Sequence, residues 1–238
     1  MKVAVILPAA GLGTRMGRTS PENSGTSRKQ FMLLDGSPIL LHTVRKFAAS
    51  PRVTEIVVAV RPEDLDWVAD LLHSQIRGKS VRVVEGGNSR QQSVANALDV
   101  LAADTDLVAV HDAVRPFIDL ETIDKVIEEA AESGAAIVGI VPVDTVKQVH
   151  HAQTGRVKIR STLPREKLVL AQTPQVFRYD LLRRAFAAAA DDAFTATDEA
   201  GLVERLDQVE VSVVLGTDRN IKITKPGDMD LARLFLNL

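Results

Sequence analysis

Short apolar runs rich in β-branched residues alternate with longer segments of helical spacing, and this alternation constrains the fold more than any other feature. Five runs are apolar along most of their length: 3–7, 55–60, 81–85, 106–111 and 135–143. Runs of this kind are typical of strands in a parallel sheet that is buried on both faces. The alternation therefore predicts an α/β fold with a Rossmann-like, doubly wound and mainly parallel sheet.

The segments between these runs carry apolar stripes at helical spacing. The stripes are Ile39, Leu40, Val44 and Phe47, then Leu65, Val68 and Leu72, and then Ile123, Val126, Ile127 and Ala130. Pro38 suits the first turn of the first helix, where its missing amide hydrogen leaves no bond unmade. Further on we expect a helix over 179–190, a short helix from 198, a strand over 209–215 and a helix after Pro226.

The alternation is interrupted between residues 144 and 172. This segment has period-2 stretches on either side of a Thr-Gly turn and no matching helix, which predicts a projecting β-hairpin arm. A two-stranded hairpin seldom buries both of its faces alone, so the arm either covers its own site or reaches a partner chain. The length favours one domain over residues 1–238, with 144–172 as its arm.

The composition excludes several classes of protein. A net charge of −2 and a single Trp and Tyr give neither a basic field nor stacking platforms for nucleic acid. No apolar run approaches the roughly 20 residues of a membrane-spanning helix, so we expect no membrane association. The chain has no cysteine, which excludes thiolate chemistry and fits the cytoplasm, where we expect the protein to reside.

The first apolar run ends in the glycine-rich turn AAGLGTRMG. Gly11 and Gly13 fit the start of a dinucleotide fingerprint, but its third place holds Met16, and the turn lacks the Gly-Lys pair of a P-loop. What remains is a turn whose backbone N–H groups can line an anion, with Arg15 and Lys29 supplying positive charge. The alternative is a tight strand-to-helix turn without a ligand.

A second glycine-containing motif, GGNSRQQSVANAL, follows the third run. Gly86 and Gly87 allow close backbone approach, and Asn88 or Ser89 can cap the helix that follows. Ser93 stands one turn inside that helix, where a cap does not explain it.

Asp112 follows the fourth apolar run, in the motif HDAVRPF. A carboxylate in such a position is costly to desolvate unless a cation pairs with it. An ion pair with Arg115 is one explanation. A magnesium site is the other, because Mg²⁺ takes one or two carboxylates together with phosphate oxygens.

Seven motifs occur in a collinear order: AAGLGTRMG, RKQF, GGNSRQQSVANAL, HDAVRPF, AQTPQVF, TDEAGLVE and NIKIT. In this order the chain resembles the 2-C-methyl-D-erythritol 4-phosphate cytidylyltransferases of isoprenoid biosynthesis, from residue 3 to the terminal helix. The resemblance implies a nucleotidyltransferase-type fold. It also implies Mg²⁺-dependent transfer of CMP from CTP to methylerythritol phosphate, giving CDP-methylerythritol and pyrophosphate.

The resemblance also implies roles for individual residues. Arg15 and Lys29 would hold the triphosphate, and Arg165 and Lys222 would place the attacking phosphate. The implied nucleotide contacts are Ala9, Ala10, Gly11, Gly13, Gly87, Asn88, Ser93 and Ala113. The implied acceptor contacts are Arg115, Thr145, Thr173 and Thr197. Asp112 would bind Mg²⁺ with Asp218 as a second carboxylate, and the arm would cross to a neighbouring subunit in a homodimer.

Three of these residues have simpler explanations, and three positions depart from the family pattern. Arg165 suits a solvated hairpin, Thr197 a helix cap in TDEA, and Lys222 an exposed strand. Arg28 stands where a proline often precedes the lysine, Asn88 replaces a common aspartate, and Val114 stands where alanine is more usual.

Other functions remain open on the sequence alone. Ribitol-5-phosphate cytidylyltransferases and other sugar- or polyol-phosphate nucleotidyltransferases share the nucleotide half and HDAVRPF, whereas TDEAGLVE and the AAG opening favour methylerythritol phosphate. The G-x-G turn raises a nicotinamide-dependent oxidoreductase, which the missing ribose carboxylate disfavours. A non-catalytic nucleotide sensor is the third alternative.

Overall fold

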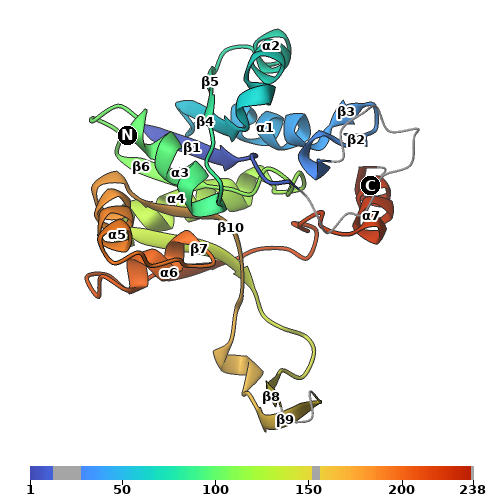
Figure 1. The fold of residues 1–238 in the computed structure, drawn as a ribbon, viewed down its shortest axis with the longest axis vertical. Helices are drawn as coiled ribbons and strands as arrows, with labels where there is room; N and C mark the ends of the chain where they lie inside the picture. The colour runs from blue at the N-terminus through green and yellow to red at the C-terminus, as the bar shows by residue number, and fades with distance from the viewer. Residues whose placement is uncertain (13–27, 152–155, 237–238) are drawn as a thin grey trace.

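The computed structural model describes residues 1–12, 28–151 and 156–236, and its centre is a seven-stranded sheet (Figure 1). The strands are β1 (Val3–Pro8), β4 (Glu55–Val60), β5 (Ser80–Glu85), β6 (Leu107–Val110), β7 (Ala135–Ile140), β10 (Leu170–Arg178) and β11 (Ser212–Leu215). They lie in the order β11-β7-β10-β6-β1-β4-β5. Only β10 runs antiparallel to its neighbours, so the predicted mainly parallel sheet is confirmed.

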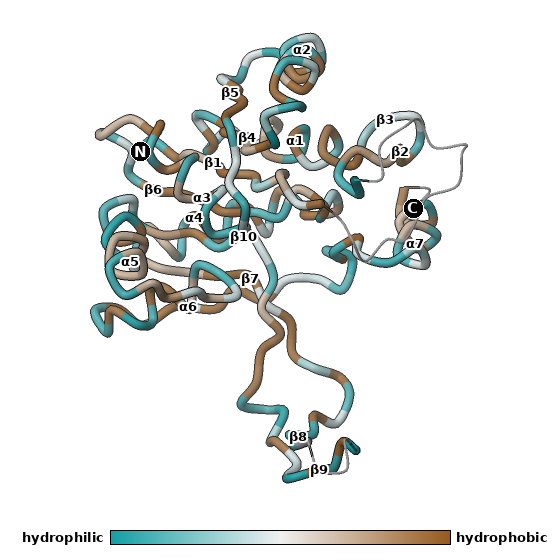
Figure 2. Tube along the Cα trace, in the orientation of Figure 1, coloured by the Kyte–Doolittle hydropathy of each residue, from teal (hydrophilic) through white to brown (hydrophobic). Residues whose placement is uncertain are grey.

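Helices cover both faces of this sheet. One apolar core joins it to α1 (Ile39–Ala49), α2 (Leu65–Gln75) and α4 (Leu120–Ser133). A second core joins the other face to α3 (Arg90–Asp99), α5 (Tyr179–Asp191) and α6 (Glu199–Glu204). Val5 of β1 belongs to the first core and Ile6 to the second, because successive side chains point to opposite faces. The fully apolar strands, brown in Figure 2, are therefore buried from both sides, and the doubly wound prediction is confirmed.

The central strand β10 is absent from the sequence-based prediction, which ends the arm at 172 and resumes with a helix near 179. Hydrophobic periodicity does not indicate this strand, because Gln172, Thr173 and Gln175 interrupt its apolar pattern. All three are buried, and each makes a polar contact: the Gln175 side chain, for example, donates to Asp198 at 2.8 Å. Polar side chains can occupy a sheet interior when each has a hydrogen-bond partner.

The predicted hairpin is present as β8 (Lys147–His151) and β9 (Val157–Thr162), paired antiparallel. It is followed by the short helix η4 (Arg165–Lys167) and projects far from the sheet (Figure 1). The described part of the hairpin packs little against the body, and Val149, Val157 and Ile159 are exposed. The Thr-Gly turn that was predicted to join the two strands lies outside the described residues.

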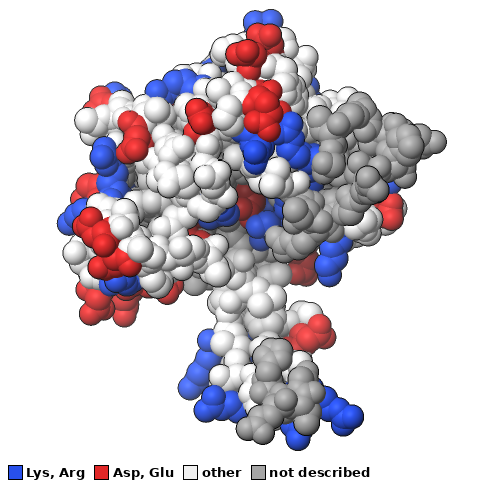
Figure 3. All heavy atoms as spheres, viewed as in Figure 1, with Lys and Arg blue, Asp and Glu red and all other residues white. Residues whose placement is uncertain are grey.

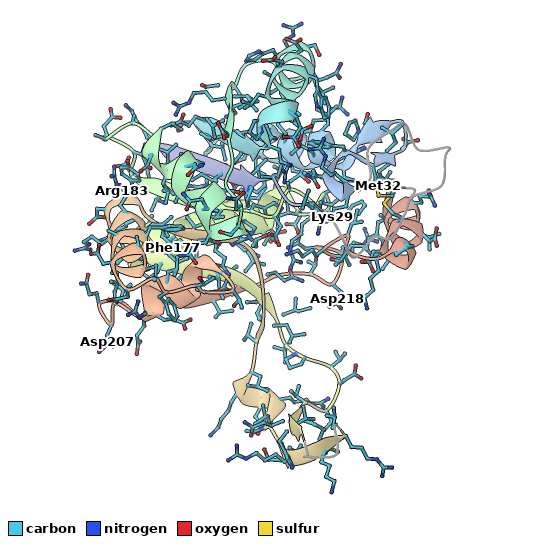
Figure 4. All side chains as sticks on the ribbon, viewed as in Figure 1. Lys29, Met32, Phe177, Arg183, Asp207 and Asp218 are labelled. Atoms are coloured by element: carbon cyan, nitrogen blue, oxygen red, sulfur yellow. The ribbon has the colours of Figure 1, made fainter. Side chains whose placement is uncertain are left out.

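Smaller elements lie at the edge of the sheet where the candidate site forms. They are η2 (Lys29–Phe31), β2 (Leu33–Leu34), β3 (Ser37–Pro38), η3 (Pro62–Asp64) and the terminal helix α7 (Pro226–Leu236). Met32, marked beside α7 in Figure 4, shares an apolar cluster with Met229 of that helix and with Ile223. This cluster fixes the segment that carries Lys222. Within the described ranges, no helix is long and apolar enough to cross a membrane.

Candidate active site

A cavity of about 590 Å³ opens at the carboxyl ends of β1, β4, β5 and β6. In open α/β sheets this edge is where ligands bind. Many of the predicted site residues line the cavity: Ala9, Ala10, Gly11, Lys29, Gly87, Asn88, Ser93, Asp112, Ala113 and Lys222. Residues from distant parts of the chain therefore meet in one cleft.

The other predicted residues lie elsewhere. Arg15 and Gly13 are outside the described residues. Arg115 and Thr173 contact Asp112 directly, at the inner end of the cleft. Thr145, Thr197 and Asp218 are exposed, as is Arg165 on the arm, whose guanidinium donates to the Val143 carbonyl. The helix cap in TDEA is Asp198, which accepts from the Gly201 amide, so the cap prediction for Thr197 is wrong by one residue.

The floor of the cleft consists of two closely packed backbone turns. A Cβ atom at Gly86 would lie 2.7 Å from the Ala10 Cβ and 3.2 Å from the Val60 carbonyl oxygen. The Gly86 amide donates to that carbonyl at 2.6 Å, and the Ala9 amide donates to the Ala59 carbonyl at 2.7 Å. Glycine at position 86 thus lets the turns after β1 and β5 form one continuous wall of backbone.

Ser89 and Ser93 hold the second of these turns. Ser89 caps α3, with its hydroxyl accepting from the Gln92 amide at 3.0 Å, as the sequence suggested. The Ser93 hydroxyl accepts from the Gly87 amide at 3.0 Å and donates to the Ser89 carbonyl at 2.8 Å. Ser93 therefore has a structural role in shaping the turn, besides its position on the cleft wall.

Asp112 is buried and is surrounded by three cations. Its carboxylate lies 3.1 Å from Arg90 Nε, 3.4 Å from Arg115 Nε and 2.8 Å from Lys222 Nζ. Burial by itself would raise the pKa of Asp112, but Arg90, Lys222 and Arg115 outweigh burial and hold the pKa well below its usual range. The ion pair with Arg115 that the sequence suggested is present, within a larger cluster.

Arg90 is the most important site residue that the sequence analysis missed. Its guanidinium bridges Asp112 and Glu199, and the Nη1 to Glu199 Oε1 distance is 2.7 Å. Glu199 is only 1% exposed, and its Oε2 has no hydrogen-bond partner among the described residues. Burial raises the pKa of Glu199 while Arg90 opposes that rise. The motif GGNSRQQS contains Arg90, but nothing in its spacing points to a carboxylate more than a hundred residues away.

Asn220 ties Arg115 to strand β10. The Arg115 guanidinium donates to the Asn220 carbonyl at 2.7 Å, and the Asn220 amide group donates to Gln172 Oε1 and to the Thr173 carbonyl, both at 2.9 Å. The Thr173 hydroxyl in turn accepts from the Asp112 amide at 3.1 Å. The polar residues that obscured β10 in the sequence thus support the inner end of the site.

A magnesium ion fits this cleft as a complex with a polyphosphate. Among the described lining residues, Asp112 is the one carboxylate, against the cations of Lys29, Arg61, Arg90 and Lys222. The described chain holds no group of three or more His, Asp or Glu side chains suited to a metal ion. One carboxylate plus phosphate oxygens is a usual ligand set for Mg²⁺. Asp218, marked with Lys29 in Figure 4, is exposed and stands apart from the lining residues.

A cationic cleft above two closely packed backbone turns, at the carboxyl edge of an open α/β sheet, is typical of an enzyme that binds a nucleotide or another phosphate-bearing ligand. Comparison with known proteins identifies the family within this class. The family model of 2-C-methyl-D-erythritol 4-phosphate cytidylyltransferase matches residues 3–238. The chain belongs to this family, and its reaction is CTP-dependent cytidylyl transfer.

Individual relatives match this chain in sequence or structure over nearly its whole length. The enzyme so named from Solibacter usitatus is 70% identical over 236 residues, which cover 99% of this chain and 96% of that protein. The one from Acidobacterium capsulatum is 52% identical and covers 99% and 98%. The crystal structure of 4-diphosphocytidyl-2C-methyl-D-erythritol synthase from Anaerococcus prevotii has a TM-score of 0.83 at 28% identity, covering 99% and 98%. The Thermus thermophilus cytidylyltransferase has a TM-score of 0.78 at 32% identity and full coverage of both chains.

Proposed function

We propose that the cleft binds CTP with Mg²⁺ next to 2-C-methyl-D-erythritol 4-phosphate and catalyses transfer of CMP between them. An oxygen of the acceptor phosphate attacks the α-phosphorus of CTP. The bond between that phosphorus and the α,β-bridging oxygen breaks, and pyrophosphate leaves with the electron pair. The observation that carries the proposal is the lining of the cleft, where four cations and one buried carboxylate surround a wall of backbone.

Charge is the main obstacle to this reaction, because two anions must approach each other. Lys29 and Lys222, with Arg15 from the glycine-rich turn, would neutralise the phosphates and stabilise the charge that develops in the transition state. Asp112 holds Lys222 at 2.8 Å and stays ionised because its pKa is low, so it is available to a cation at neutral pH. A bound Mg²⁺ would add Lewis-acid stabilisation of the phosphate oxygens.

The nucleotide would lie along the wall formed by the turns after β1 and β5. Ala9, Ala10, Gly11 and Gly13 would offer backbone to the triphosphate, while Gly87, Asn88, Ser93 and Ala113 would surround cytosine and ribose. The close approach of the two turns at Gly86 supports this arrangement, since it makes them one continuous surface along which the nucleotide can lie.

The acceptor would lie at the inner end of the cleft, with contacts from Arg115, Thr173 and Thr197 of one chain. Thr145 and Arg165 would come from the arm of the neighbouring subunit. Arg115 and Thr173 already contact Asp112, which supports their assignment. The segment 144–169 carries six Lys or Arg and two acidic residues, and Figure 3 shows this basic character on the projecting arm. A basic arm suits a phosphate-bearing acceptor.

The arm supports a homodimer in which each arm reaches the partner's cleft. Val149, Val157 and Ile159 are 49%, 57% and 63% exposed. An isolated two-stranded hairpin is marginally stable in water, so a second chain would supply the missing cover. The proposal also includes one domain over 1–238 with a 144–172 arm, a cytoplasmic location and no nucleic-acid partner. Asp218 would be a second metal contact from outside the residues that line the cavity.

The direct test is acceptor choice. Purified protein with CTP and Mg²⁺ should release pyrophosphate with methylerythritol phosphate, but not with ribitol 5-phosphate. Turnover with ribitol 5-phosphate alone would reject the proposed acceptor. Light scattering on the same sample tests the dimer, and dependence of the rate on added Mg²⁺ tests the metal.

A further inference from the structure

Lys29 lies directly between two residues that are anchored in different ways. On its N-terminal side, the Arg28 guanidinium makes a two-point ion pair with Asp64: Nη2 lies 2.6 Å from Oδ1, and Nη1 contacts Oδ2. The Arg28 side chain is 16% exposed and that of Asp64 is 1% exposed. A paired fork of this kind fixes both distance and orientation.

Two aromatic rings complete the arrangement around this ion pair. The Trp67 indole donates to Asp64 Oδ1 at 3.1 Å. The Phe31 ring packs edge-on against Trp67 with centroids 4.6 Å apart, and the Arg28 guanidinium lies 5.3 Å from the Phe31 centroid. Arg28, Phe31, Asp64 and Trp67 therefore form a closed set, the anchor cluster, which joins η2 to η3 and α2.

On the C-terminal side of Lys29, Gln30 is anchored to the glycine-rich turn. Its side-chain amide donates to the Ala9 carbonyl at 2.6 Å and to the Gly11 carbonyl at 3.0 Å, and the residue is 2% exposed. The backbone of η2 is thus held from two sides, and Lys29 extends from it into the cavity lining.

We propose that Arg28 is a positioning residue for cytidylyl transfer, acting through the anchor cluster to hold η2 where Lys29 meets the phosphates. The inference rests on the role proposed above for Lys29. A lysine side chain has four rotatable bonds, so its reach is defined only when its backbone is fixed. A displacement of about 1 Å at a reacting group can cost about 10²-fold in rate.

The chain supplies its own reporter for this cluster. Trp67 is the only tryptophan, so intrinsic fluorescence reports on the ring that contacts Asp64 and Phe31. Loss of the ion pair should change Trp67 emission even in a fully folded protein.

The test compares Arg28→Met, Arg28→Lys and Asp64→Asn with Lys29→Met as reference. Arg52→Met is the matched control, because Arg52 pairs with Asp124 and Glu128 on the surface away from the cleft. Arg28→Met should lower kcat about 10- to 100-fold and leave the KM of the acceptor within twofold, while changing Trp67 emission. Arg28→Lys should recover part of kcat, since lysine keeps the charge but not the fork. Arg52→Met should stay within twofold of wild type.

Urea unfolding of each variant shows whether a lower kcat comes from misplacement of Lys29 or from loss of the fold. Asp64→Asn tests the same ion pair from its other partner, because it weakens the pair while keeping the side-chain shape. The double variant Arg28→Met/Asp64→Asn should have a kcat no lower than that of the slower single variant, because both substitutions break the same ion pair. If Lys29→Met is inactive while Arg28→Met keeps wild-type kcat despite changed emission, the positioning role is overturned alone. If Lys29→Met keeps full activity, the proposed role of Lys29 and the positioning role are both overturned.

Discussion

Replacement of Arg90 by methionine should destabilise the fold, because it leaves its ion-pair partner Glu199 buried without a cation. Arg90 donates to Glu199 at 2.7 Å, and Glu199 is 1% exposed with one carboxylate oxygen already unpartnered among the described residues. Asp112 also loses Arg90, the cation that lowers its pKa most, but it keeps Arg115 and Lys222. The larger penalty therefore falls on Glu199, which becomes a buried carboxylate without its cation.

The size of the effect follows from burial. Breaking a buried ion pair by removing one partner costs about 3–5 kcal/mol, because the remaining charge is uncompensated. We expect the lower end, about 3 kcal/mol, since burial has already raised the pKa of Glu199 and a proton can neutralise it. Glu199→Gln should cost about 1 kcal/mol alone, and in the Arg90→Met background it should restore about 2 kcal/mol.

Urea unfolding followed by Trp67 fluorescence measures the four members of this cycle at pH 7. The pH dependence provides a second readout. Arg90 opposes the rise that burial causes in the pKa of Glu199, so removing Arg90 should raise that pKa further, and the folded variant should take up the proton more readily than the folded wild type does. The deficit of Arg90→Met relative to wild type should therefore shrink as the pH falls toward 5. A loss below 1 kcal/mol, or a double variant no more stable than Arg90→Met, would refute the reasoning.

Three further predictions concern His111, Gly86 in the floor of the cleft, and Asp112. Burial lowers the pKa of His111 from 6.5 to about 4, so the unfolded chain binds its proton first and stability falls as pH drops from 6.5 to 4. At about 1.4 kcal/mol per pKa unit this contribution is on the order of 3 kcal/mol, and urea unfolding in metal-free buffer should show a flatter profile for His111→Gln. Gly86→Ala should push the turns after β1 and β5 apart, cost about 1–3 kcal/mol and weaken CTP binding in calorimetry. Gly227→Ala, which lies in α7 and meets nothing within 4 Å, should lower neither quantity. Asp112→Asn should raise the Mg²⁺ concentration needed for half-maximal rate, and an unchanged titration would remove Asp112 from the metal site.

The fold could be predicted where apolar periodicity dominates and not where polar groups are paired in the interior. The strand Glu55–Val60 and the stripe on α4 follow directly from residue type, because burial on one or both faces selects them. Strand β10 does not, because Gln172 and Gln175 are tolerated only through partners that lie far away in the chain.

The candidate site divides in the same way. Asp112 was predictable because an ionised group at the end of an apolar strand needs a partner. The bridge from Arg90 to Glu199 spans 109 positions, and the fork from Arg28 to Asp64 spans 36, so neither can be deduced from local spacing. Such contacts exist only once the sheet has brought its strand ends together.

The central claim is that the cations of this cleft drive cytidylyl transfer, and the rate of Lys222→Met tests it most directly. Lys222 lines the cavity and pairs with Asp112 at 2.8 Å, while the buried Ile223 beside it keeps the local fold in place. In a pyrophosphate-release assay with CTP, Mg²⁺ and methylerythritol phosphate, the account predicts a loss of about 10²-fold or more in kcat for a variant that still unfolds cooperatively in urea. A folded Lys222→Met variant that turns over at the wild-type rate would contradict it.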